Sequence, residues 1–202
     1  MENQIQYLNE WLELAKSGDF YKAQELYYEK LFGSVIENFC QRNTKSITKG
    51  GVLFSILGLS PEPIILTARA VNPDKHIIFT TNNRTDGNEY LEKYLGSDFE
   101  MVYMDTDDFN AIYRALKEQL VINPSSQLTL DITGGKKSMV AAASIFGKDY
   151  GCKIVYVDFS EYLKEHIREV TGFNVIKGFL NLSIADSYWI DQLLENVLSE
   201  GY

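Results

Sequence analysis

The residues best suited to chemistry lie in one short stretch, 131–139, with the sequence DITGGKKSM. Gly134 and Gly135 permit positive φ angles and let a ligand approach the backbone closely. A helical run follows directly, so the free N–H groups of its first turn point into the same space. Lys136 and Lys137 add two cations where the helix dipole already favours negative charge. The stretch is therefore typical of a site for a phosphate or a phosphodiester.

Spacing alone leaves a second interpretation of this stretch open. A glycine pair between a strand and a helix can be only a tight connection, with both lysines solvated. The known nucleotide-binding fingerprints do not decide the matter. The stretch lacks the G-x-x-x-x-G-K-[ST] spacing of a P-loop, and it is not G-x-G-x-x-G.

Alternating strands and helices surround the stretch and position it. Apolar runs predict strands at 52–58, 76–81, 100–104, 127–132 and 153–159, with helices between them, one of them from Asn88 to Leu95. Ser60 is a plausible N-cap for the helix after the first strand, with Pro61 or Pro63 in its first turn. The pattern predicts an α/β fold with a Rossmann-like parallel sheet and helices on both faces.

The predicted sheet order, 3-2-1-4-5, reverses between strands one and four, and ligands of such sheets bind outside the carboxyl ends there. Three loops converge at this mouth. The candidate ligand-binding residues come from these loops: Gly58, Leu59, Ser60, Thr80, Thr81, Asn82, Asn83, Thr133, Gly134, Gly135, Lys136, Lys137, Ser138 and Met139. The lysines are expected to hold phosphates, and the loop backbone is expected to donate N–H groups.

The acidic run at 105–108 predicts the start of a helix rather than a metal site. Acids in a first helical turn are favoured by the helix dipole, and Thr106 or Asp107 makes a good N-cap. Cys40 and Cys152 are far apart and lack metal-ligand spacing. We therefore expect neither a metal nor a cofactor.

The regions outside the sheet are predicted to be helical. Residues 4–16 place Leu8, Trp11, Leu12 and Ala15 on one face, and residues 20–40 do the same with Phe32, Val35, Ile36 and Phe39. Residues 185–200 are predicted to form a third amphipathic helix. The expected organisation is a helical hairpin at 1–45, joined by the polar linker 42–51 to a Rossmann domain at 46–182, and a terminal helix at 183–202.

Composition limits the function classes. The formal net charge of -9 argues against a surface that coats long nucleic acids. No stretch reaches the roughly 18 apolar residues that a membrane span needs. The sequence predicts a cytoplasmic protein whose anionic ligand is bound locally.

The stretch LDITGGKKSMVAAAS resembles the signature loop of the CRISPR-associated Rossmann fold (CARF) domains, which carry D-[IVY]-T-G-G-[TK]-K-x-M after their fourth strand. The segment ILGLSPEPIILTARAVNPDKHIIFTT is similar to the family's first βαβ unit. YVDFSEYL and the following IREVTGFNVIKGFLNL are similar to its fifth strand and trailing hairpin. The resemblance covers about residues 50–182.

The resemblance implies a homodimer that binds a cyclic oligoadenylate, most often the four-membered ring, in a pocket shared across the two-fold axis. It also implies type III CRISPR antiviral signalling, in which such a sensor controls a fused effector. The sequence has no deaminase H-x-E with P-C-x-x-C, and Arg168 follows His166 by two residues, so these two do not form an R-x4-6-H pair. A fused or missing effector is therefore expected beyond the terminal helix.

An alternative of a different class is a metal-independent ring nuclease that degrades the cyclic tetra-adenylate it binds. Lys137, Lys136 and Ser60 are its candidate catalytic residues. Binding without cleavage is favoured, because a phosphate cradle can stabilise the bound ring without lowering the barrier.

Overall fold

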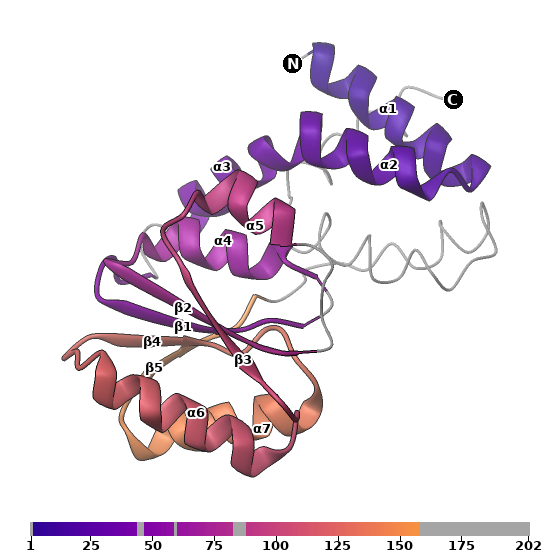
Figure 1. Ribbon diagram of the computed structural model, residues 1–202. Helices are drawn as coiled ribbons and strands as arrows, with labels where there is room; N and C mark the ends of the chain where they lie inside the picture. Colours follow the sequence, from indigo (N-terminus) through magenta and orange to yellow (C-terminus); the bar gives the residue numbers. More distant parts are fainter. Residues whose placement is uncertain (1, 44–46, 59, 83–87, 158–202) are drawn as a thin grey trace. The chain divides into compact units, whose positions relative to one another are not determined.

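The computed structural model describes residues 2–43, 47–58, 60–82 and 88–157 of the 202-residue chain (Figure 1). The chain divides into two compact units. One includes residues 1–42, and the other is formed by residues 43–157. The predicted helix at 183–202, and the predicted hairpin after the fifth strand, lie outside the described residues.

The amino-terminal unit is helical, as predicted. Helix α1 (Glu2–Ser17) ends before Gly18, whose φ of 81° suits the end of a helix, and Asp19 caps the next segment by accepting the Lys22 N–H at 3.4 Å. Three helical segments then follow one another: α2 (Phe20–Leu26), the π-helical η1 (Tyr27–Leu31) and α3 (Phe32–Asn43). Their predicted apolar faces are buried, including Leu8, Trp11, Ala15, Phe32, Val35, Ile36 and Phe39, while Leu12 is partly buried.

The second unit is a five-stranded parallel sheet in the predicted order, β3-β2-β1-β4-β5. Its strands are β1 (Val52–Ile56), β2 (Lys75–Thr81), β3 (Glu100–Met104), β4 (Leu128–Asp131) and β5 (Lys153–Val155). Four helices connect them: α4 (Glu62–Val71), α5 (Asn88–Leu95), α6 (Phe109–Ile122) and α7 (Lys137–Asp149). Helices α4 and α5 lie on one face of the sheet, and α6 and α7 lie on the other (Figure 1).

The two faces of the sheet differ in polarity. The face beneath α6 and α7 is an apolar core that contains Phe54, Phe79, Leu130 and Phe146. The opposite face carries buried polar residues on three adjacent strands: Ser55, His76, Thr80, Thr129 and Asp131. Ser55 Oγ and His76 Nε2 lie 3.0 Å apart, and burial lowers the pKa of His76 to about 3. The imidazole is therefore neutral at physiological pH.

Two predicted helix starts are wrong by one or two residues. Pro61, not Ser60, is the N-cap of α4, because the Pro61 carbonyl accepts the first intrahelical bond, from Ile65 N–H at 3.1 Å; Pro63 lies in the first turn as expected. At α6 the cap is Asp108 rather than Thr106 or Asp107, because the Asp108 carboxylate accepts the Ala111 N–H at 2.9 Å. Each start depends on where the preceding loop leaves the sheet, which local propensity does not fix.

Several strand ends also differ from the prediction. β1 ends at Ile56 rather than at 58, because the chain turns there toward the loop after β4. β4 is shorter than predicted at both ends, and the described part of the fifth strand ends at Val155. The predicted strand residues 158 and 159 lie outside the described residues. Among the helices that the structure describes, none is long and apolar enough to span a membrane.

Candidate functional site

The loops after β1 and β4 touch through their backbones at the carboxyl edge of the sheet. A Cβ atom added to Gly134 would lie 2.3 Å from the carbonyl oxygen of Ile56 and 2.8 Å from the Gly58 nitrogen. One added to Gly58 would lie 2.5 Å from the Gly135 nitrogen. Only glycines permit this approach. The two loops therefore form one continuous surface at the point where the strand order reverses.

Gly135 makes the turn that leads into α7. Its φ is 91°, a conformation that other L-residues rarely adopt, and a Cβ there would lie 2.5 Å from Ile56 Cγ2. Glycine is therefore required at the two positions for different reasons. Gly134 is needed for close packing, and Gly135 is needed for both its backbone angle and its packing.

Asp131, the last residue of β4, fixes the start of the glycine–lysine loop through hydrogen bonds. Its Oδ1 accepts hydrogen bonds from the Thr133 N–H at 2.9 Å and from the Thr133 hydroxyl at 2.6 Å. The same hydroxyl accepts the Val157 N–H at 2.8 Å, which ties the end of β4 to the residues after β5. Asp131 is fully buried, and burial raises its pKa to about 6, although hydrogen bonds from Thr133 and Thr67 oppose the rise.

The sequence analysis did not predict that Asp131 accepts hydrogen bonds from Thr133, although the spacing of the two residues indicates it. An aspartate two residues before a threonine is the spacing of an Asx-turn, in which the carboxylate accepts the N–H two residues further on. Thr133, which was predicted to be a ligand contact, uses its hydroxyl within the fold.

The N-terminus of α7 has no side-chain cap from an oxygen. The first intrahelical bond joins Val140 N–H to the Lys136 carbonyl at 3.0 Å, so the N–H groups of residues 137–139 precede the bonded ladder. Lys136 occupies the N-cap position, and its ammonium group has no acceptor to offer. The sulfur of Met139, which is buried, accepts the Lys136 N–H at 3.5 Å. The positive end of this helix is available to an external anion.

The two lysines of the loop differ in their partners. Lys136 forms an ion pair with Asp107 of the loop between β3 and α6, which the sequence did not predict. Ser138 Oγ donates to the backbone carbonyl of the same aspartate at 2.8 Å. Lys137 is exposed, and its ammonium group contacts no partner in the described ranges. Lys137 is therefore the cation that the loop leaves open.

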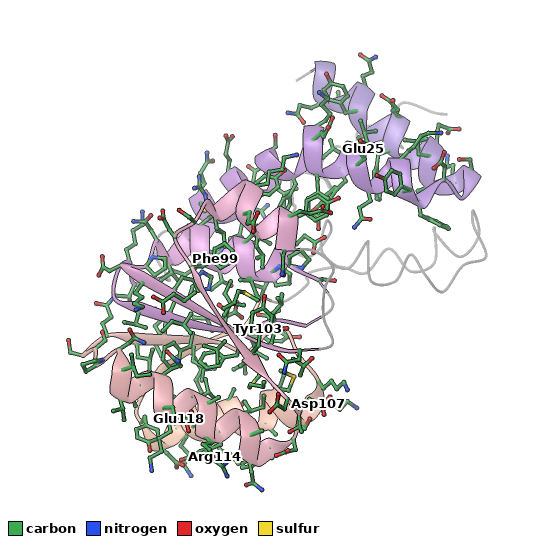
Figure 2. The ribbon with its side chains drawn as sticks, in the orientation of Figure 1. Glu25, Phe99, Tyr103, Asp107, Arg114 and Glu118 are labelled. Atoms are coloured by element: carbon green, nitrogen blue, oxygen red, sulfur yellow. The ribbon has the colours of Figure 1, made fainter. Side chains whose placement is uncertain are left out.

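The loop after β2 joins the site indirectly. The side chain of Asn82 donates to Asp105 Oδ1 at 2.7 Å, and its backbone N–H donates to the Met104 carbonyl at 3.0 Å. The β3–α6 loop therefore lies between Asn82 and the lysine loop. Figure 2 shows its Asp107 beyond the carboxyl end of β3, past Tyr103.

The remaining predicted site residues differ in how far they are buried. Thr80 and Met139 are buried, with 1% and 3% of their surface exposed, so both support the site from within the fold. Thr81 and Ser60 are partly exposed at the same edge. Leu59 and Asn83 lie outside the described residues. Within the described ranges, no three acidic, histidine or cysteine side chains gather as metal ligands.

Comparisons with known proteins found sequence similarity to a CRISPR protein and to arginine–tRNA ligases. No family model matches the chain. Over 121 residues, 57% of the chain, it is 31% identical to the CRISPR system endoribonuclease Csm6 of Thermus thermophilus. The chain covers 26% of that relative, about a quarter of its length. A segment of 45 residues, 22% of the chain, is 51% identical to 8% of the arginine–tRNA ligase of Bacteroides thetaiotaomicron.

Solved structures with similar backbones include two ligand complexes. Can2 from Sulfobacillus thermosulfidooxidans, in complex with cyclic tetra-adenylate, aligns with 54% of this chain and 32% of its own, at 21% identity and a TM-score of 0.45. Enterococcus italicus Csm6, bound to cyclic hexa-2′-fluoro-hexa-dAMP, aligns with 61% of this chain and 38% of its own, at 17% identity and a TM-score of 0.45.

The fold and the site define the class of the protein: a Rossmann-like sheet that presents a glycine–lysine loop where its strand order reverses. Together with the similarity to Csm6, they confirm the resemblance that the signature loop indicated. The resemblance is to the CARF domains found in type III CRISPR systems.

Proposed function

We propose that the chain is a cyclic oligoadenylate sensor, with cyclic tetra-adenylate as its ligand, and that it acts in the cytoplasm. The observation that carries the proposal is the α7 N-terminus. Its N–H groups lack a side-chain oxygen cap, and Lys137 beside them has no partner in the described part of the chain. This arrangement supplies donors and positive charge to a phosphodiester without need of a metal.

A homodimer would complete the site. A cyclic tetranucleotide can adopt two-fold symmetry, and an isologous dimer presents the same loop twice, so each half of the ring meets identical amides and lysines. Lys137 and the backbone of Gly134, Gly135 and Ser138 hold the phosphates. Thr81 and the loop after β2 face the adenine or ribose edges, and loop closure across the dimer axis is passed to an effector.

Calorimetry with rings of three, four and six adenylates tests the proposal. The four-membered ring is expected to bind with two chains per ring. Lys137→Ala removes two charge-assisted contacts per ring, and at about 1.5 kcal/mol each this weakens binding roughly a hundredfold. Lys148→Ala is the matched control, because Lys148 is an exposed lysine in the last turn of the same helix.

The outcomes separate the site from its alternatives. Unchanged binding in Lys137→Ala would mean that the loop is only a tight connection with solvated lysines. A preference for the six-membered ring would change the ligand and keep the site. Absence of heat with every ring would contradict the proposed function.

A ring nuclease is the second candidate, and it is favoured by the ammonium group of Lys137, which has no partner among the described residues. In such cleavage a ribose 2′-hydroxyl attacks its adjacent phosphate and a 2′,3′-cyclic phosphate forms. The 5′-oxygen leaves and takes up a proton in place of the one that the 2′-hydroxyl loses, so a positioned cation can suffice. Lys137 would stabilise the developing charge, with Lys136 and Ser60 beside it. Incubating the four-membered ring with the protein in EDTA distinguishes the candidates, because a sensor alone leaves the ring intact.

A further inference from the structure

One of the two lysines at the site already has an anionic partner from the chain itself. Lys136 Nζ pairs with Asp107 Oδ2, although the two residues come from different strand-to-helix loops. The lysine side chain is 74% exposed, whereas that of the aspartate is 35% exposed. The acid is therefore the anchored half of the pair, and the lysine is the half that is free to move.

The loop that carries Asp107 is tied down on both sides. Asp105 accepts the side-chain amide of Asn82 at 2.7 Å, and Asp108 caps α6 through the Ala111 N–H at 2.9 Å. The Asp107 carbonyl accepts the Ser138 hydroxyl at 2.8 Å. Because each neighbour is fixed, the Asp107 carboxylate is held at the lysine loop rather than sampling the solvent freely.

We infer that Asp107 is an affinity-determining residue of the site, whose carboxylate holds Lys136 until a phosphate of the ligand takes its place. This inference rests on the proposed function. Binding then exchanges one ion pair for another, so Lys136 contributes less net free energy than an unpaired lysine would. Lys137 makes a full contribution, because it has no such partner in the described ranges.

Repulsion between the Asp107 carboxylate and the ligand phosphate also weakens binding. A carboxylate that remains beside Lys136 lies within a few ångströms of the incoming phosphate, well inside the screening length of about 8 Å at physiological salt. Exposed ion pairs contribute up to about 1 kcal/mol, which corresponds to about fivefold in a binding constant. Asp107 therefore raises the ligand concentration at which the sensor becomes occupied.

Asp107→Asn tests the inference, since it keeps the shape of the side chain and the carbonyl that Ser138 contacts. Calorimetry with cyclic tetra-adenylate is expected to show about threefold to tenfold tighter binding than in the unchanged protein. The affinity of the variant should also fall more steeply with salt, because Lys136 then releases a counterion on binding. Asp98→Asn is the matched control: it removes one exposed negative charge before β3, and it should leave both readouts unchanged.

If the ligand phosphate exchanges with Asp107 at Lys136, the gain in affinity from Asp107→Asn should depend on Lys136. In a Lys136→Ala background, the gain from Asp107→Asn should be smaller than in the unchanged protein, because only the repulsion remains once the lysine that the acid holds is gone. An equal gain in the two backgrounds would assign the effect to repulsion alone and overturn the exchange.

The failures of the inference and of the proposed function are distinguishable. If the ring binds, but Asp107→Asn binds it equally or more weakly, Asp107 positions Lys136 for the ligand and the inference is wrong. If neither protein binds any ring, the proposed function fails and the inference fails with it.

Discussion

Helices α6 and α7 lie side by side on the same face of the sheet and both begin at its carboxyl edge, yet their N-termini are built in opposite ways (Figure 1). The 14-residue α6 is capped by its own acid, since Asp108 accepts the Ala111 N–H. The 13-residue α7 has a lysine at the same position, and no side-chain oxygen of the described residues caps its free N–H groups. The proposed anion site lies where the chain lacks the acid that would otherwise cap the helix.

The two N-termini also interact, because the acidic loop reaches the basic one. Asp107 pairs with Lys136, and the Ser138 hydroxyl donates to the Asp107 carbonyl. The β3–α6 loop therefore caps α6 and also contacts residues at the N-terminus of α7. The difference between the two N-termini can be tested by substitutions in the glycine–lysine loop, in the buried Asp131 beneath it and in the N-cap residue of α7.

The largest effect is expected from Gly134→Ala. The added Cβ would lie 2.3 Å from the Ile56 carbonyl oxygen, and backbone cannot move aside as a side chain can. We expect a loss of about 3 kcal/mol in the free energy of unfolding. Urea denaturation followed by far-UV circular dichroism measures it. Gly33→Ala in α3 is the control, since nothing lies within 4 Å of its added Cβ; an equal effect there would contradict the argument.

The buried support of the loop should respond to pH. The pKa of Asp131 is raised from an ordinary 3.8 to about 6, so its stabilising contribution is complete below about pH 4 and is lost as the pH rises through 6. Asp131→Asn cannot ionise and keeps an oxygen for Thr133. Relative to the unchanged protein, it should gain about 2 kcal/mol of stability between pH 4 and pH 7. Thermal melts across this range test it, and a constant difference would show that the carboxylate does not titrate there.

Much of the fold was predictable from the sequence because its determinants are local. The strand order follows from regular strand–helix alternation, and the register of faces follows from apolar periodicity. Helix α5 was predicted with its observed bounds, because a polar segment and Gly96 delimit it. The glycine–lysine loop was identifiable because its residue types are unusual at a strand–helix junction.

The missing parts of the site depend on contacts between distant residues. Nothing near Lys136 in the sequence indicates that Asp107, 29 positions earlier, reaches it. Likewise, Thr133 becomes a structural residue only because the Val157 N–H comes to its hydroxyl. The acids at 105–108 were correctly assigned to a helix start, but only Asp108 caps it, while Asp105 and Asp107 serve the neighbouring loops.

The smallest expected effect distinguishes the backbone of the α7 N-terminus from its charge. Lys136→Ala removes a cation and leaves the first-turn N–H groups open, whereas Lys136→Ser also supplies an N-cap oxygen that can accept the Met139 N–H. The serine variant should be more stable than the alanine variant by about 0.5–1 kcal/mol.

The serine variant should nevertheless bind cyclic tetra-adenylate about twofold to fivefold more weakly, because its hydroxyl competes with the phosphate for a donor that contributes about 0.5–1 kcal/mol. Thermal melts and calorimetry on the matched pair measure the two quantities. Stability and affinity would then move in opposite directions from one change of side chain. Equal affinities in the two variants would instead show that the ligand contacts the lysines of this loop without using the helix amides.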